Sequence, residues 1–112
     1  MEKELLDYTL DALKTLLAVD SPTGFSKNAA DTLLRAFAAL EIPAKRTEKG
    51  GVLADLSMFA AEDADAGNGI LLSAHIDTLG AMVRQIKGNG RLKVTNVGGL
   101  NANNTETEFV RV

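Results

Sequence analysis

The sequence predicts an α/β fold in which two helices precede a mixed sheet. Two stretches repeat apolar residues at steps of three and four, and short runs of β-type residues with glycine turns follow them. The run from Ile70 to Ala74 has no polar alternation, which is typical of a strand buried on both faces. With 46% hydrophobic and 24% charged residues among 112, the composition is that of a globular chain.

Both helices are predicted in the first forty residues. Residues 3–18 place an apolar stripe on one helix face, formed by Leu6, Leu10, Leu13 and Leu17. The sequence Ser-Pro-Thr-Gly at 21–24 ends this helix, because proline and glycine oppose its continuation. A second helix is predicted over 26–40, with Ser26 as a side-chain N-cap. Its buried face is expected to comprise Ala29, Leu33, Phe37 and Leu40.

The remaining residues are predicted to form strands, turns and loops. Strands are expected at 44–47, 52–56, 70–74, 80–86, 91–97 and 108–112. Gly50-Gly51 and Asn89-Gly90 mark two hairpin turns, and Gly98-Gly99 marks a bend in the sheet. Residues 60–69 are small, polar and acidic, and they lack the ligand spacing of a calcium loop, so a solvated loop is favoured.

The composition also excludes several classes of function. The chain has no cysteine, which rules out disulfides and thiolate zinc sites. The net charge is −3 and the basic residues are scattered, whereas a nucleic-acid interface needs a basic stripe on one face. There is no signal-peptide core and no apolar stretch of the roughly 20 residues that span a membrane. We therefore expect a cytoplasmic protein with no nucleic-acid or membrane partner.

The candidate site is His75-Ile76-Asp77, at the end of the apolar run. Residues two apart lie on the same side of a strand, and open α/β sheets place their sites at the carboxyl ends of strands. A carboxylate can hold one imidazole nitrogen while the other binds a metal ion. One histidine without cysteine cannot close a metal site by itself. On residue types alone, a buried structural histidine is favoured over a metal ligand.

Longer motifs around this pair resemble peptidase family 42, the metal-dependent aminopeptidases that include glutamyl and deblocking aminopeptidases. The resemblance lies in residues 73–83 (Ser-Ala-His-Ile-Asp-Thr-Leu-Gly-Ala-Met-Val), Gly90-Arg91-Leu92 and Val97-Gly98-Gly99. The order of helix, Ser-Pro-Thr-Gly break, second helix and hairpin is similar too. The resemblance covers nearly the whole chain, but only about the N-terminal third of a family member. Related exopeptidases and deacylases share the His-x-Asp pair, so the longer motifs carry the specificity.

The resemblance implies a fold, a reaction and a role for each site residue. Residues 1–79 would form the N-terminal part of a zinc-exopeptidase α/β sandwich, and residues 80–112 would begin an inserted β-rich domain that takes part in oligomer assembly. The complete enzyme would hydrolyse N-terminal residues from peptides with two divalent metal ions, zinc or cobalt, and would be a homo-oligomer. His75 would be a metal ligand, and Asp77 would be the catalytic-site carboxylate that orients its ring.

The resemblance also places the remaining metal ligands and the general base of the family beyond residue 112. We therefore expect no tightly bound metal and no peptide hydrolysis from these residues alone. The chain ends within a strand pattern, which favours a segment of a longer protein. One alternative is a non-catalytic assembly or interaction module derived from the family. Another is an amidase or deacylase, which the run from Thr78 to Val83 argues against.

Overall fold

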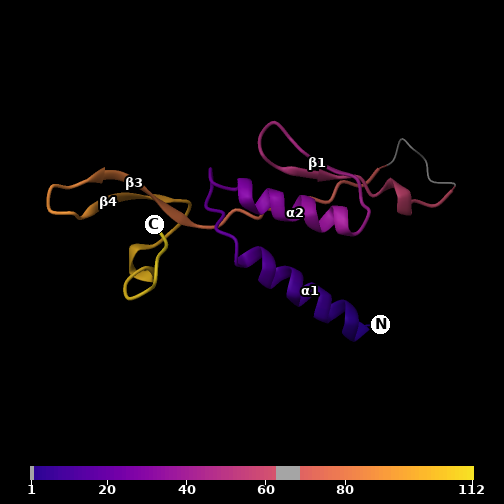
Figure 1. Ribbon diagram of the computed structural model, residues 1–112, viewed down its shortest axis with the longest axis horizontal. Coiled ribbons are helices and arrows are strands. Elements are labelled where there is room, and N and C mark those ends of the chain that lie inside the picture. The colour runs from indigo at the N-terminus through magenta and orange to yellow at the C-terminus, as the bar shows by residue number, and fades with distance from the viewer. Residues whose placement is uncertain (1, 63–68) are drawn as a thin grey trace.

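The computed structural model describes residues 2–62 and 69–112, which form two helices and two β-hairpins (Figure 1). The helices are α1 (Glu2–Leu17) and α2 (Lys27–Ala39), and the strands are β1 (Ala44–Arg46), β2 (Val52–Ala54), β3 (Gly80–Ile86) and β4 (Leu92–Val97). Short 3-10 turns lie at Ser57–Phe59 and Ala102–Asn104. This content confirms an α/β chain. The described strands nevertheless form two separate antiparallel pairs, and not one mixed sheet.

Both predicted helices are confirmed, with ends within one residue of those expected. Glu2 and Glu4 lie in the first turn of α1, where negative charge complements the helix dipole. Ser26 precedes α2 as predicted, but its side chain makes no capping hydrogen bond. Its backbone has φ −92° and ψ 4°, outside the extended conformation in which a capping side chain reaches the free N–H groups. The expected side-chain cap is therefore wrong.

The first hairpin packs beside α2 (Figure 1). Strands β1 and β2 pair with Arg46 opposite Val52, and Gly50, at φ +87°, occupies the turn that joins them. Arg46 reaches α2, where its guanidinium forms an ion pair with the carboxylate of Asp31. The only buried hydrophobic residues in the described part of the chain are Ala29 and Ala30 of α2. The hydrophobic core is therefore very small.

The second hairpin is a long ribbon that extends away from the helices (Figure 1). Strands β3 and β4 pair from Gly80 opposite Val97 to Ile86 opposite Leu92. The predicted Asn89-Gly90 turn is confirmed, since the Gly90 N–H donates to Lys87 O at 2.9 Å and Gly90 has φ +80°. The predicted bend after β4 is confirmed at Gly98, where φ is +74°.

Two predicted strands are wrong. Residues 70–74 pair with no strand among the described residues, and Ile70, Leu71 and Leu72 are 89%, 80% and 83% exposed. Residues 108–112 are likewise outside any strand, with Phe109 fully exposed. A strand forms only when neighbouring strands satisfy its backbone N–H and C=O groups, and the described residues supply none here. Of the predicted 60–69 loop, residues 63–68 lie outside the described residues.

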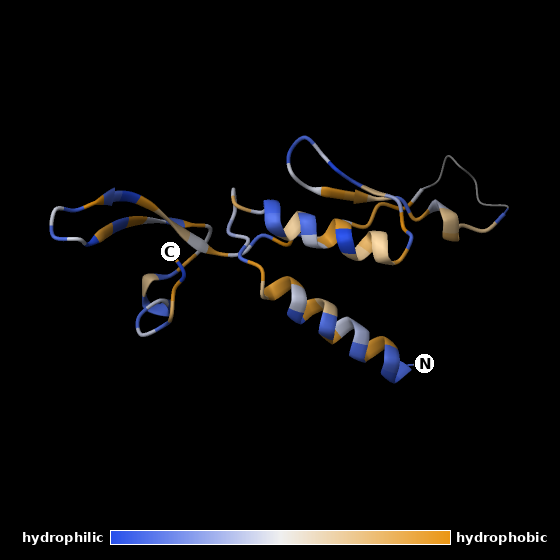
Figure 2. Ribbon diagram, in the orientation of Figure 1, coloured by the Kyte–Doolittle hydropathy of each residue, from blue (hydrophilic) through white to orange (hydrophobic). Residues whose placement is uncertain are grey.

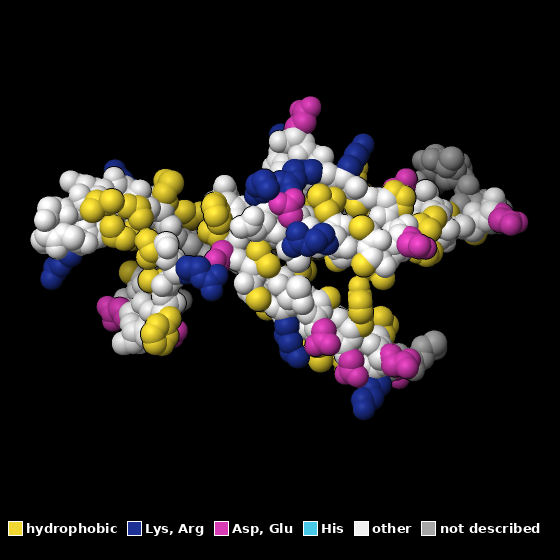
Figure 3. Space-filling model, in the orientation of Figure 1, with side chains coloured by type: hydrophobic (Ala, Val, Ile, Leu, Met, Phe, Trp, Pro, Cys, Tyr) yellow, Lys and Arg dark blue, Asp and Glu magenta, His cyan; other side chains and the backbone are white. Residues whose placement is uncertain are grey.

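The described chain is far from compact. Its radius of gyration is 18.8 Å, whereas a compact chain of this length has about 13 Å. Its accessible surface is 9879 Å², compared with about 5,900 Å² expected for a folded monomer of this mass. The leucine stripe of α1 is exposed at each of its four residues, Leu6, Leu10, Leu13 and Leu17. Figure 2 shows hydrophobic residues recurring along this helix. Hydrophobic side chains are also exposed on the β3–β4 ribbon, where Figure 3 shows them gathered over part of one face.

Within residues 2–62 and 69–112, no helix has both the length and the hydrophobicity that crossing a membrane requires.

Candidate functional site

The structure brings His75 and Asp77 into contact, as their spacing predicts. The Nδ1 atom of His75 lies 3.2 Å from Asp77 Oδ1 and 3.1 Å from the backbone oxygen of Asp77. An ionised carboxylate and a carbonyl can only accept, so Nδ1 must carry a proton. In the neutral ring, Nε2 then keeps its lone pair. The His75 side chain is 86% exposed, and Nε2 has no hydrogen-bonding partner among the described residues.

The backbone that carries this pair is held by the sequence Ser21-Pro22-Thr23-Gly24, called here the 21–24 turn. The Oγ of Ser21 donates to Ile76 O at 2.8 Å, and the N–H of Thr78 donates to Ser21 O at 2.9 Å. Pro22 and Thr78 form a parallel β-bridge, and Ser21 is only 1% exposed. These contacts hold the backbone on both sides of Asp77. The turn therefore does more than end α1.

A third contact reaches the Asp77 side chain itself. The Oγ1 of Thr23 donates to Asp77 Oδ2 at 2.6 Å. This hydrogen bond is the main reason that the pKa of Asp77 lies below its ordinary value. Desolvation, the second effect in size, raises the pKa, and the weaker effect of the hydrogen bond from His75 lowers it. Asp77 is therefore ionised at neutral pH, as the assignment of the Nδ1 proton requires.

Two site residues, Ser21 and Thr23, were not predicted from the sequence. Ser21 lies 55 residues before Ile76, and Thr23 lies 54 residues before Asp77. No periodicity or spacing in the sequence connects the 21–24 turn with the segment that carries His75 and Asp77. The only available signal was a pair of hydroxyl side chains in a helix break. The expected strand setting is also corrected, because His75 and Asp77 lie in an extended segment whose one bridge is at Thr78.

His75 and Asp77 fit one ligand position of a metal site, in which a carboxylate holds the far side of a ligating imidazole. Among the described residues, no three histidine, aspartate or glutamate side chains gather in a way that could hold a metal ion. The described residues therefore offer one exposed donor nitrogen and no complete site.

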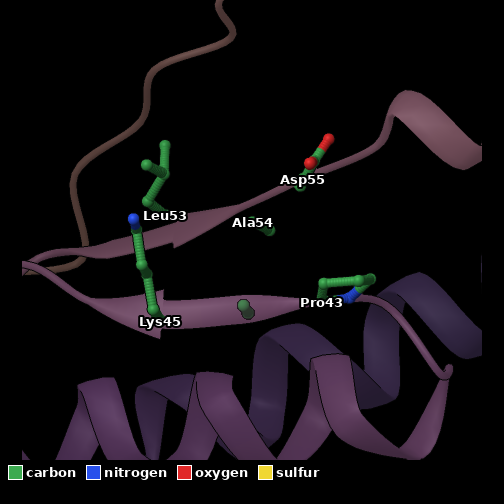
Figure 4. Close-up of a pocket in the computed structure, with 6 residues that line it drawn as sticks. Pro43, Lys45, Leu53, Ala54 and Asp55 are labelled. Atoms are coloured by element: carbon green, nitrogen blue, oxygen red, sulfur yellow. The ribbon is translucent and has the colours of Figure 1, made fainter.

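A hollow in the described structure lies elsewhere, on the β1–β2 hairpin (Figure 4). It encloses about 450 Å³ and is lined by Pro43, Ala44, Lys45, Leu53, Ala54 and Asp55. Lys45 and Leu53 point away from α2 on the outer face of the hairpin. Its lining includes neither His75 nor Asp77, so the hollow does not extend the candidate site.

Comparison with known proteins confirms the resemblance to peptidase family 42. The sequence profile of the M42 glutamyl aminopeptidase family matches residues 57–112, which include His75, Asp77 and the β3–β4 ribbon. The chain is also 34% identical over 104 residues to the Bacillus subtilis (strain 168) protein named "Putative aminopeptidase YhfE". The match covers 93% of this chain and 29% of that relative, so the chain spans less than a third of the relative's length. The chain belongs to the M42 glutamyl aminopeptidase family.

Proposed function

We propose that this chain supplies one histidine ligand to a two-metal aminopeptidase that releases N-terminal residues from peptides. The supporting observation is the state of the His75 ring, whose Nδ1 is held by Asp77 while Nε2 is left exposed. Membership of the M42 family supports peptides as the substrate class and divalent ions such as zinc or cobalt as the cofactors. In this proposal His75 binds metal, and Asp77 orients the ring.

The same proposal holds that these 112 residues do not hydrolyse peptides alone. A catalytic zinc ion takes about three protein ligands, and a two-metal site takes more. The chain contains one histidine and no cysteine, and its described carboxylates do not gather around His75. His75 and Asp77 therefore present one ligand nitrogen, and the other groups needed for hydrolysis lie outside the described residues.

A zinc titration of the purified chain tests the ligand assignment. We expect weak binding of one zinc ion that disappears in His75→Ala and persists in Glu106→Gln, a control that removes an exposed carboxylate. Binding that is equal in His75→Ala and the parent chain would contradict the assignment. Tight His75-dependent binding would contradict the claim that the ligand set is incomplete.

A chimera tests the wider claim about catalysis. In it, this chain replaces the matched segment of the B. subtilis relative, and release of N-terminal residues from a peptide is assayed with added zinc or cobalt. We expect activity from the chimera and none from its His75→Ala variant. A folded chimera that is inactive with either metal would count against the proposal.

The alternative is a non-catalytic module that assembles with copies of itself in the cytoplasm. One observation favours it, namely the unpaired apolar segment 70–72, whose three side chains are each at least 80% exposed. Unpaired extended segments recruit strands from other chains unless they are covered. A defined oligomer that shows no His75-dependent zinc binding would favour this alternative, whereas His75-dependent zinc binding favours the first candidate whatever the molar mass.

A further inference from the structure

The 21–24 turn places a hydroxyl group against the carboxylate that orients His75. Pro22 O accepts from the Phe25 N–H at 2.7 Å, and Gly24 has φ +88° at the third position of this four-residue turn. That is the geometry of a type II turn, which requires a positive φ at the third position. Thr23 therefore occupies the second position of a closed turn, whose backbone hydrogen bond does not involve Asp77.

We propose that Thr23 is a positioning residue, whose hydroxyl fixes the Asp77 carboxylate so that Asp77 selects the Nδ1-protonated tautomer of His75. The role of this tautomer rests on the proposed function, in which Nε2 must be free to bind metal. Thr23 would act only through Asp77.

The two oxygens of Asp77 are divided between two partners. Oδ2 accepts from Thr23 at 2.6 Å, within the range of strong hydrogen bonds to a charged oxygen, and Oδ1 faces His75 Nδ1 at 3.2 Å. The terminal torsion of an aspartate is broad and roughly two-fold, so an unrestrained carboxylate rotates easily. The Asp77 side chain is 41% exposed, so water would compete for both oxygens. The Thr23 hydrogen bond restricts that rotation.

Another residue of the turn supports this contact. Ser21 holds the Ile76 carbonyl and the Thr78 N–H, so the backbone on both sides of Asp77 is fixed without the Thr23 hydroxyl. His75 Nδ1 also has the backbone oxygen of Asp77 at 3.1 Å, and that acceptor does not depend on Thr23. Loss of the hydroxyl should therefore change the tautomer ratio without abolishing the preferred form.

Long-range ¹H–¹⁵N NMR of the imidazole ring tests the proposal directly. The chain has a single histidine, so its ring signals need no assignment. The ¹⁵N shifts show when the ring is neutral, and in the neutral ring they report the tautomer ratio. We expect Thr23→Val to move the ratio towards the Nε2-protonated form by about two- to tenfold, the factor expected for one net hydrogen bond. Thr23→Ser should restore the parent ratio, because serine keeps the hydroxyl.

Thr15→Val is the matched control, since Thr15 donates its hydroxyl to Asp11 O within α1 and not to a site residue. It should leave the ratio unchanged. The amide signal of Thr78 reports whether the 21–24 turn stays docked on residues 75–78, because that amide donates to Ser21 O. An unchanged ratio in Thr23→Val with Thr78 in place would overturn the proposal.

Asp77→Asn keeps the test decisive if Thr23→Val undocks the turn. The amide is a weaker acceptor than the carboxylate, so we expect a shift towards the Nε2-protonated form. A parent-like ratio in Asp77→Asn would also overturn the proposal, because Asp77 would not then select the tautomer. None of these measurements uses a metal ion, so a negative zinc titration bears on the proposed function alone.

Discussion

Pro22 and Gly80 approach each other so closely that residue 80 has no room for a side chain. A Cβ atom built on Gly80 would lie 2.6 Å from the Cβ of Pro22, closer than such atoms come in real proteins. Gly80 is the first residue of β3, and Pro22 lies in the 21–24 turn, so this contact joins the ribbon to the turn that holds the candidate site.

Gly80→Ala should therefore loosen the docking of the turn. The pyrrolidine ring is rigid and Pro22 is bridged to Thr78, so the clash cannot be relieved by rotating a flexible side chain. We expect a loss of about 1–3 kcal/mol in the free energy of unfolding, the usual effect of overpacking. Urea denaturation measures this loss. Gly88→Ala is the control, because its added methyl would meet nothing within 4 Å. Equal stability of the two variants would contradict the prediction.

Ser21→Ala should weaken the same docking through a lost hydrogen bond. The Ser21 side chain is buried and donates to Ile76 O at 2.8 Å, so its removal leaves that carbonyl without this donor. The expected cost is about 0.5–1.5 kcal/mol. Faster exchange of the Thr78 amide would report the change locally, since that amide donates to Ser21 O. Ser73→Ala, at an exposed position two residues before His75, should leave the exchange rate of the Thr78 amide unchanged.

Asp31 should titrate below its ordinary pKa of 3.8. The hydrogen bond from Lys27 is the main cause of the lowered pKa. Desolvation, the second effect in size, raises the pKa, and the charge of Arg46 lowers it by a smaller amount. A pKa lowered by folding means that this carboxylate stabilises the fold above pH 3.8 and loses that effect as the pH falls through the folded pKa. Carbon-13 NMR of the carboxyl group measures the value.

The matched variants for Asp31 are Lys27→Met and Lys45→Met. Lys27→Met should raise the Asp31 pKa towards 3.8, because it removes the main hydrogen-bond donor. Lys45 points away from α2, so Lys45→Met should leave the pKa unchanged (Figure 4). Equal shifts in the two variants would show that the pKa responds to net charge and not to the Lys27 contact.

The isolated chain should self-associate as its concentration rises. The unpaired segment 70–72 exposes three large apolar side chains, and exposed apolar patches of this kind mark association surfaces. Sedimentation velocity over a concentration series should show a growing mass for the parent chain and a smaller increase for Leu71→Lys. Ser73→Lys adds the same charge nearby but removes no apolar group. If both variants reduce association equally, charge repulsion and not the apolar segment is responsible.

The local elements of this protein could be predicted because their causes lie within a few residues. The helix ends follow from the apolar period and the Ser-Pro-Thr-Gly break, and both hairpins follow from their glycine turns. The contact between His75 and Asp77 also has a local cause, a spacing of two residues in an extended segment. The strand predicted at 70–74 failed because periodicity detects apolar residues, whereas a strand also needs partners that lie far away in sequence.

The sequence by itself determined the α/β content, the family and the histidine–aspartate pair. Only the tertiary structure showed that Ser21, Pro22 and Thr23 hold that pair, each through a contact with residues 76–80. The physical reason is the separation along the sequence between the residues that interact. Local sequence encodes the helix period, the turns and the contacts between residues two apart. The contact between the Thr23 hydroxyl and the Asp77 carboxylate, 54 residues apart, depends instead on how the fold brings residues 76–80 beside the 21–24 turn.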